Sequence, residues 1–309
     1  MAGKIKKMFF SFLLQKKAES FLKTRVSECM NLYPITIKTH ESVIQAATKM
    51  IGQGISSIIV KDNDEVKGLV TERDFINKVA LNSTVLNKKV ADIMTGKLIS
   101  VSPKDTLESV FELMKKNNIR KVVVMDQNKL LGIITQKDLL SLFHKNFARA
   151  GSSKSLVSDW MTKNIIFVSS KASFSEAKSV MKTKDVGAIF VQEKKDYVGL
   201  FTEHDIVAQL YDQGGILKIG TPKEVMSPYI RCIEDGESVF FANTLMLTKN
   251  IRRLGVIKDN KLVGVITQTD VAQAMFFALE EMKKQKLKSQ KIKKRFDEEF
   301  ISEHLKIYA

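Results

Sequence analysis

Four short stretches of the chain place a threonine three residues before an aspartate. One of them is "LGIITQKD" at residues 131–138, and the four aspartates are Asp74, Asp138, Asp205 and Asp270. The spacing fits a capping box, in which the two side chains close the first turn of a helix. A carboxylate is also a strong hydrogen-bond acceptor, because it is charged. The motif therefore predicts a helix start, and by itself it requires no ligand.

Basic residues stand at a second repeated position in two of the four stretches. Arg120 and Lys121 precede one middle strand, and Arg252 and Arg253 precede another, whereas the other two copies have small residues at 56–57 and 187–188. The copies with basic residues read Thr-Gln-x-Asp, and the other two read Thr-Glu-x-Asp. A helix N-terminus offers free N–H groups to an anion. Cations beside such a terminus are compatible with a bound anion, although a solvated surface charge is the ordinary alternative.

Glycine and methionine recur in phase with this motif. The glycines are separated by 64, 67 and 65 residues, and so are four upstream methionines. A match at both ends with equal gaps indicates four whole copies of one unit. The glycines are Gly68, Gly132, Gly199 and Gly264, and the methionines are Met30, Met94, Met161 and Met226.

Each copy is expected to fold in the order β-α-β-β-α, an α/β (α+β) unit. In the second copy the alternation at 98–101 predicts a strand, and the amphipathic run at 105–118 predicts a helix. Residues 119–126 and 130–135 read as two strands joined by a turn at 127–128, and Asp138 opens a second helix. A unit of about 55 residues buries little core alone and should pair with another copy.

These four in-phase motifs resemble cystathionine-β-synthase (CBS) domains arranged as two tandem pairs, or Bateman modules. The resemblance covers about residues 26–279, and the plan is similar to the γ subunit of AMP-activated protein kinase. It implies two pairs packed as a disc, with helical, basic termini at 1–25 and 280–309. The first pair would be 26–147 (copies 26–82 and 90–147) and the second 156–279 (copies 156–212 and 222–279), joined by a linker at 148–155.

The resemblance also implies where a nucleotide would bind. In the family the motif aspartate accepts from ribose, the threonine lies near the phosphates, and the paired copy supplies the wall around adenine. Carried across, the pocket of Asp138 holds Thr135, Lys137, Arg120 and Lys121, with Ile35, Ile55, Ser56 and Ser57 as its wall. The pocket of Asp270 holds Thr267, Thr269, Arg252 and Arg253, with Ile166, Val186, Gly187 and Ala188 as its wall.

The remaining two pockets are expected to be weaker. Asp74 would be joined by Thr71 and Arg73, with a wall from Ile99 and Ile119. Asp205 would be joined by Thr202 and His204, but its wall position is Arg231, where the other copies have isoleucine.

The rest of the sequence offers no catalytic machinery. The four copies take up almost the whole chain, the four histidines are isolated, and the two cysteines lie far apart. We therefore expect no catalytic residue, no metal site and no catalytic cofactor. No apolar run approaches the length that spans a bilayer, which favours a cytoplasmic protein.

The two ends carry most of the excess charge. The chain has a net charge of +16, and residues 1–25 and 283–295 hold nearly all of it. Residues 5–13 form an amphipathic stripe, which could pack on the protein's own core or lie on an anionic membrane. Met275, Phe276, Leu279 and Met282 are expected to pack on the second pair, and the basic tail beyond them could contact nucleic acid.

The resemblance implies a non-catalytic regulatory protein that senses AMP, ADP or ATP in clefts between paired repeats. It would modulate an unidentified protein partner and could form a homodimer. S-adenosylmethionine is the rival ligand, because the ribose and adenine contacts would be shared. The alternative is a nucleic-acid-binding or membrane-surface adaptor that uses the basic termini.

Overall fold

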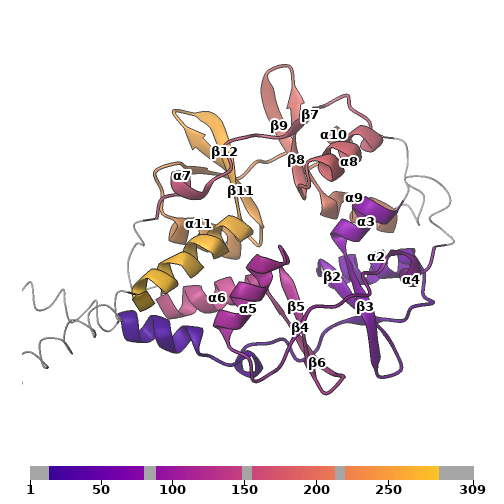
Figure 1. The fold of residues 1–309 in the computed structure, drawn as a ribbon. Coiled ribbons are helices and arrows are strands. Elements are labelled where there is room, and N and C mark those ends of the chain that lie inside the picture. Colours follow the sequence, from indigo (N-terminus) through magenta and orange to yellow (C-terminus); the bar gives the residue numbers. More distant parts are fainter. Residues whose placement is uncertain (1–13, 80–87, 148–154, 213–219, 285–309) are drawn as a thin grey trace, which may run out of the picture.

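The computed structural model describes residues 14–79, 88–147, 155–212 and 220–284, and four similar units follow one another along them (Figure 1). The first unit contains η1 (Val26–Glu28), β1 (Thr36–Ile37), α2 (Val43–Gly52), β2 (Ser57–Asp62), β3 (Glu65–Thr71) and α3 (Glu72–Lys78). The second contains α4 (Val90–Ile93), β4 (Ser100–Val101), α5 (Leu107–Lys116), β5 (Lys121–Asp126), β6 (Lys129–Thr135) and α6 (Gln136–Phe147).

The second half of the chain repeats this order. The third unit contains α7 (Val157–Trp160), β7 (Phe167–Ser169), α8 (Phe174–Thr183), β8 (Ala188–Glu193), β9 (Asp196–Thr202) and α9 (Glu203–Asp212). The fourth contains α10 (Pro222–Val225), β10 (Cys232–Glu234), α11 (Val239–Thr248), β11 (Arg253–Lys258) and β12 (Lys261–Thr267), followed by a helix over 268–284. The predicted order β-α-β-β-α is confirmed.

Each unit has its own three-stranded sheet. The first strand pairs parallel to the second, and the second pairs antiparallel to the third. The hairpin predicted at 127–128 is present, with positive φ at both Gln127 and Asn128, as a type I′ turn requires. A serine or threonine caps the first full helix of every unit by accepting from the backbone N–H three residues on, so the local sequence also fixes where these helices begin.

The recurring methionine and glycine hold two units together. A Cβ on Gly132 would stand 2.5 Å from the backbone oxygen of Asn31 and 3.2 Å from the sulfur of Met30, both in the first unit. Gly68 meets Met94 of the second unit in the same way. Because only glycine leaves room for this approach, the repeated glycine marks the surface on which its partner unit sits. The third and fourth units exchange the same contacts through Gly199 and Gly264.

The two pairs pack through helices around a common centre, as expected for a disc (Figure 1). Helices α2 and α3 of the first unit lie against α9 of the third, and α6 of the second lies against α11 of the fourth. Val207 and Leu210 of α9 are buried in the core of the first unit, and Ile76 of α3 is buried in the core of the third. Residues from both pairs therefore share the cores of the first and third units.

The terminal helices lie on the side of the second and fourth units. Residues 14–22 are helical, and Phe21 packs edge-on against Phe143 and Phe147 with ring centroids 6.0 and 5.6 Å apart. At the other end Met275, Phe276 and Leu279 are buried, and Met282 packs against them. The stripe at 5–13 and the tail at 285–309 lie outside the described residues, and among those described no helix is long and apolar enough to cross a membrane.

Candidate ligand-binding clefts

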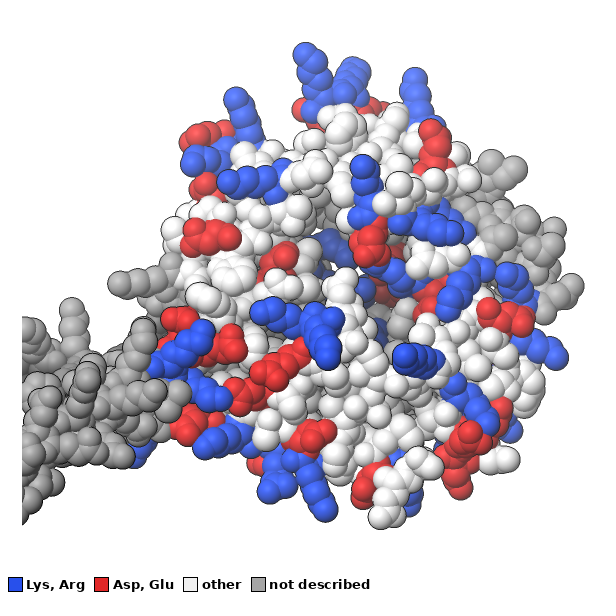
Figure 2. All heavy atoms as spheres, viewed as in Figure 1, with Lys and Arg blue, Asp and Glu red and all other residues white. Residues whose placement is uncertain are grey.

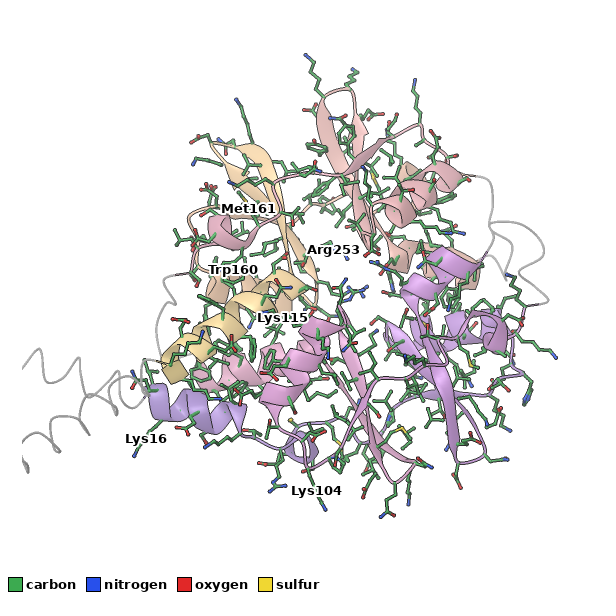
Figure 3. The ribbon with its side chains drawn as sticks, in the orientation of Figure 1. Lys16, Lys104, Lys115, Trp160, Met161 and Arg253 are labelled. Carbon is green, nitrogen blue, oxygen red and sulfur yellow. The ribbon has the colours of Figure 1, made fainter. Side chains whose placement is uncertain are left out.

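Two cavities meet at the centre of the disc, with volumes of about 680 Å³ and 650 Å³. Figure 2 shows a hollow near the middle of the molecule, with basic and acidic atoms in its depth. Glu72 and the four basic residues before β5 and β11 line both cavities. Figure 3 shows one of these, Arg253, at the centre between the sheets, whereas Lys16 and Lys104 lie at the periphery. The cations that the sequence divided between two pockets thus belong to one shared centre.

The residues expected around Asp138 come together in the second cavity. Its walls include Asp138, Thr135, Lys137, Arg120 and Lys121 from the second unit, and Ile35, Ile55, Ser56 and Ser57 from the first. The apolar side and the basic side of the cavity therefore come from the two members of one pair. This arrangement offers a surface for an aromatic base at one end and cations at the other.

Asp138 closes the first turn of α6 with only one of its carboxylate oxygens. Its Oδ2 accepts from the backbone N–H of Thr135 at 2.8 Å and from the Thr135 hydroxyl at 2.6 Å. Among the described residues, no side chain or backbone group donates to Oδ1. The capping interpretation is thus realised, and it leaves an acceptor available in the cavity.

Asp74 has no such free oxygen. Its Oδ2 makes the same cap with Thr71 at 2.8 and 2.7 Å. Its Oδ1 accepts from the Thr95 hydroxyl at 3.2 Å and lies 2.8 Å from Nζ of Lys78. The threonine and Arg73, together with Ile99 and Ile119, line the first cavity as expected. The acid itself, however, is already satisfied, a feature that its motif did not reveal.

Asp205 and Asp270 stand slightly behind their cavities. The cavities are lined by the capping threonines, Thr202 in the second and Thr267 in the first, and not by the two aspartates. Burial raises the pKa of both carboxyl groups, although the hydrogen bonds from the threonines act in the opposite direction. Each keeps one oxygen for the cap and, in the described chain, has no donor on the other.

The remaining predicted residues of these two sites also line the cavities. Beside Thr267, the first cavity has Thr269, Arg252, Arg253, Ile166, Val186, Gly187 and Ala188. Beside Thr202, the second cavity has His204 and Arg231. Arg231 is exposed, so the wall position that holds isoleucine elsewhere carries a charged side chain at the cavity edge.

Two of the central cations, Lys121 and Arg253, form no ion pair with any acid among the described residues. Lys121 donates from Nζ to the backbone oxygen of Ser56 at 3.1 Å and to its hydroxyl at 3.0 Å. Burial and the neighbouring charges of Arg120 and Arg252 lower the pKa of Lys121 to about 7. Burial and Arg252 likewise lower the pKa of Arg253 to about 10. An anion in either cavity would relieve this crowding of positive charge.

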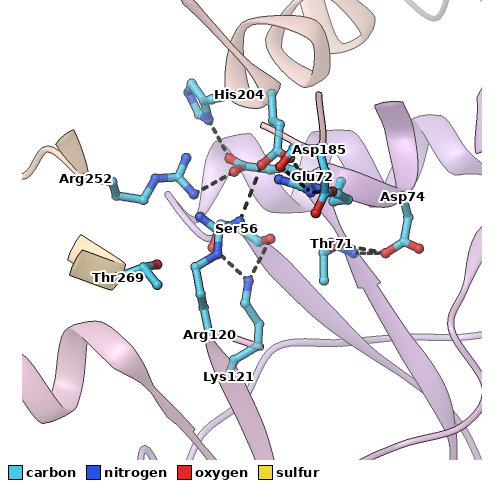
Figure 4. A network of polar contacts seen from close by, with 12 residues as sticks. Ser56, Thr71, Glu72, Asp74, Arg120, Lys121, Asp185, His204, Arg252 and Thr269 are labelled. Carbon is cyan, nitrogen blue, oxygen red and sulfur yellow. Dashed lines mark hydrogen bonds and ion pairs between the residues drawn. The ribbon is translucent and has the colours of Figure 1, made fainter. Parts of the chain in front are cut away.

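Two buried glutamates hold the other cations (Figure 4). Glu72 is 3.0 Å from Nδ1 of His204 and 2.7 Å from Nη1 of Arg252. Glu203 is 2.6 Å from Nε of Arg73 and 3.5 Å from Nη2 of Arg120. Burial alone would raise the pKa of Glu72, but the hydrogen bond from His204 and the charge of Arg252 outweigh it and hold that pKa at about 2.

These glutamates are the second residue of the Thr-Glu-x-Asp motif. The alternation of this motif with Thr-Gln-x-Asp was visible in the sequence but pointed to no role. In the structure the glutamates and the glutamines at the equivalent positions all lie near the centre. Among the described residues, no group of three or more histidine, cysteine, aspartate or glutamate side chains could hold a metal ion.

Comparison with known proteins agrees with this architecture. A relative from Methanocaldococcus jannaschii, the uncharacterised protein MJ1225, is 25% identical over 211 residues, which span 64% of this chain and 75% of the relative. An uncharacterised 33.4 kDa protein of Thermofilum pendens is 29% identical over 192 residues, 59% of this chain and 63% of that protein, so the match spans less than two thirds of it.

Two solved structures share the fold over most of the chain. The structure of MJ1225, described as a proposed archaeal homologue of γ-AMPK, superposes with a TM-score of 0.72 at 18% identity and covers 81% of this chain and 99% of that one. A conserved protein from Pyrococcus horikoshii gives 0.55 at 20% identity, with 82% and 100% covered. The profile of the CBS domain matches residues 26–81, 90–145, 157–212 and 223–276, and this chain therefore belongs to the CBS domain family.

Proposed function

We propose that this protein is a non-catalytic, cytoplasmic regulator that binds adenine nucleotides in the two central cavities. The observation that carries the proposal is the second cavity, where an acceptor oxygen of Asp138 lies with the apolar side chains of Ile35 and Ile55 and the cations Arg120 and Lys121. These groups match the ribose diol, the adenine ring and the phosphate of an adenine nucleotide, respectively. MJ1225, whose fold is shared, is described as a proposed homologue of a subunit of an AMP-activated kinase, which is consistent with the same ligand class.

The cations favour a phosphate over a sulfonium group as the ligand's charged end. Nine lysine and arginine side chains line the two cavities, against the five carboxylates of Glu72, Asp74, Asp138, Asp185 and Glu203. AMP, ADP or ATP would be attracted by this excess charge, whereas the cationic centre of S-adenosylmethionine would be repelled. We therefore rank the nucleotides above S-adenosylmethionine.

Ligand occupancy would act on a partner protein through the packing of the two pairs. The cavities are lined by all four units, so a ligand in either cavity contacts both pairs and can shift their relative position. A ligand changes such an equilibrium only by binding one arrangement more tightly than the other.

The proposal is tested by the ligands that the purified protein carries and prefers. Mass spectrometry of the denatured protein should detect an adenine nucleotide, and calorimetry on the ligand-stripped protein should give tighter binding of AMP or ADP than of S-adenosylmethionine. Absence of binding by any adenosine compound at millimolar concentration would refute the proposed function. Tighter binding of S-adenosylmethionine would refute the preference for phosphate.

A further inference from the structure

We infer that Glu72 and Glu203 are resident anions that compete with a ligand's phosphate for the central arginines, and so set the preference between phosphorylated and unphosphorylated adenosine ligands. The inference rests on the proposed function for the ligand class. The competition itself is a property of the charged centre and can be tested with an inorganic anion.

The arginines are partly exposed to the cavities, whereas the glutamates are buried in the cavity walls among them. The side chains of Arg73, Arg120 and Arg252 are 31%, 36% and 31% exposed, whereas those of Glu72 and Glu203 are 4% and 2% exposed. A phosphate that enters a cavity therefore meets guanidinium groups already paired with carboxylates. A phosphate that binds Arg120 or Arg252 therefore competes with a carboxylate that already attracts the same guanidinium.

Glu203 also stands close to Arg253, which forms no ion pair with an acid in the described part of the chain. A Cβ on Gly187 would be 3.0 Å from Oε2 of Glu203 and 3.3 Å from Nη2 of Arg253. Glycine at this position leaves space in which the carboxylate and the guanidinium can approach. The same Oε2 accepts no hydrogen bond of good geometry among the described residues and has Arg120 only at 3.5 Å. Glu203 thus lies among several cations, but among the described residues it forms a close ion pair only with Arg73.

The equivalent positions in the other two units show that the acid is not needed to build the motif. Gln136 and Gln268 begin α6 and the following helix at 268, and both are buried. Thr269 donates to Oε1 of Gln136 at 3.2 Å, and Nε2 of Gln268 donates to the backbone oxygen of Ile251 at 3.4 Å. Two units have a neutral amide at this position, so the fold does not require a carboxylate here. The carboxylates of the other two units therefore act through their charge.

Every pair made by the two glutamates joins one module to the other. Glu72 belongs to the first pair of units and binds His204 and Arg252 of the second, and Glu203 of the second binds Arg73 and Arg120 of the first. A phosphate that draws Arg120 or Arg252 away from its carboxylate therefore loosens a contact between modules. The charge of the ligand is in this way linked to the packing on which regulation would depend.

The test compares AMP with adenosine on Glu72→Gln, Glu203→Gln and the double variant by calorimetry. AMP should bind about 10-fold tighter to each single variant, the lower end of what a hydrogen bond to a charged group contributes, while adenosine affinity stays unchanged. The ligand-free variants should melt at lower temperature, because their arginines lose a buried partner. Glu193→Gln removes an exposed ion pair with Lys223 outside the cavities and serves as the matched control, with no change in either ligand.

Gln136→Glu provides the opposite perturbation and guards against variants that fail to fold. It adds a third carboxylate to the centre and should weaken AMP binding without affecting adenosine. If AMP binds the glutamine variants equally or more weakly than the wild type, the glutamates only orient the arginines and the inference is wrong.

Inorganic tripolyphosphate separates this inference from the proposed function. If the wild type binds no adenosine compound, the proposed function fails, but tripolyphosphate should still raise the melting temperature of Glu72→Gln and Glu203→Gln more than that of the wild type. Equal stabilisation of all three proteins by tripolyphosphate would overturn the inference, whatever the adenosine compounds do.

Discussion

Replacing Asp138 by alanine separates the two uses of its carboxylate. Oδ2 caps α6 through Thr135, so its loss should cost about 0.5–2 kcal/mol of unfolding free energy. Oδ1 accepts from no described residue in the second cavity, and a hydrogen bond from ribose to a charged acceptor is worth about 1.5–3 kcal/mol. Asp138→Ala should therefore weaken AMP binding in that cavity about 10- to 100-fold while the protein remains folded.

Asp74→Ala is the matched comparison, because the two sites share the cap and differ in the second oxygen. Oδ1 of Asp74 is held by Lys78 and Thr95, so this variant loses the cap and a partly exposed ion pair worth about 0.2–1 kcal/mol. It should lose more stability than Asp138→Ala and yet change AMP affinity little. Asp138→Asn keeps a capping acceptor and should keep most of the stability.

Calorimetry gives the affinity and stoichiometry of each variant, and denaturant unfolding of the same samples gives its unfolding free energy. The reasoning is refuted if Asp138→Ala binds AMP as the wild type does despite its lower stability, since the aspartate would then be a cap alone. A larger loss of binding in Asp74→Ala than in Asp138→Ala would refute the assignment of the free oxygen.

Three further outcomes follow from packing and charge. Gly132→Ala should cost about 1–3 kcal/mol in a denaturant melt, because its Cβ would collide with the partner unit; Gly52→Ala, where nothing lies within 4 Å, should not destabilise the protein. Phe21→Ala should cost about 3–5 kcal/mol since Phe21 is buried in the core, whereas Phe277→Ala, half exposed, should cost much less in the same melt. The pKa of Lys121 is lowered from 10.5 to about 7, so between these pH values the folded protein binds fewer protons than the unfolded chain. The unfolding free energy should therefore rise with pH across that window, and AMP affinity should fall above pH 7. Both trends should be weaker in Lys121→Met.

The order of elements could be predicted because each signal is local and occurs four times. The hairpin turn at Gln127 and Asn128, the capping serines and the period of the helices each depend on a few neighbouring residues. The recurring Met30 and Gly132 were recognised as a repeat, but their role was not, since the contact joins residues about 100 apart in sequence. In this protein, residues that repeat without a role in their own unit form the contact between paired units.

The residues that line the cavities were predicted only in part, and the reason differs from that for the order of elements. Residues that the family resemblance assigned to Asp138 do line one cavity, because they are tied to elements whose order was correctly predicted. The sequence ranked the site of Asp74 below that of Asp138, but it did not reveal that the second oxygen of Asp74 is occupied, since this depends on Lys78 and Thr95, which no motif singles out. The sequence ranked the site of Asp205 lower because of Arg231, and binding to either weaker site remains a prediction.

The shared centre could not be read from any single copy. Arg120 and Arg252 stand at the same position of the repeat, and a copy-by-copy interpretation gives each its own pocket; only the packing of the two modules brings both into the same pair of cavities with Glu72 and Glu203. The second and fourth copies carry equivalent cations, and the first and third copies have glutamate where the others have glutamine, so that each acid finds its partners across the module boundary. Because each acid faces arginines of the opposite module, the charge state of the cavities and the contact between the modules depend on each other. A repeat protein with four glutamines at these positions would keep the same fold and lose this dependence.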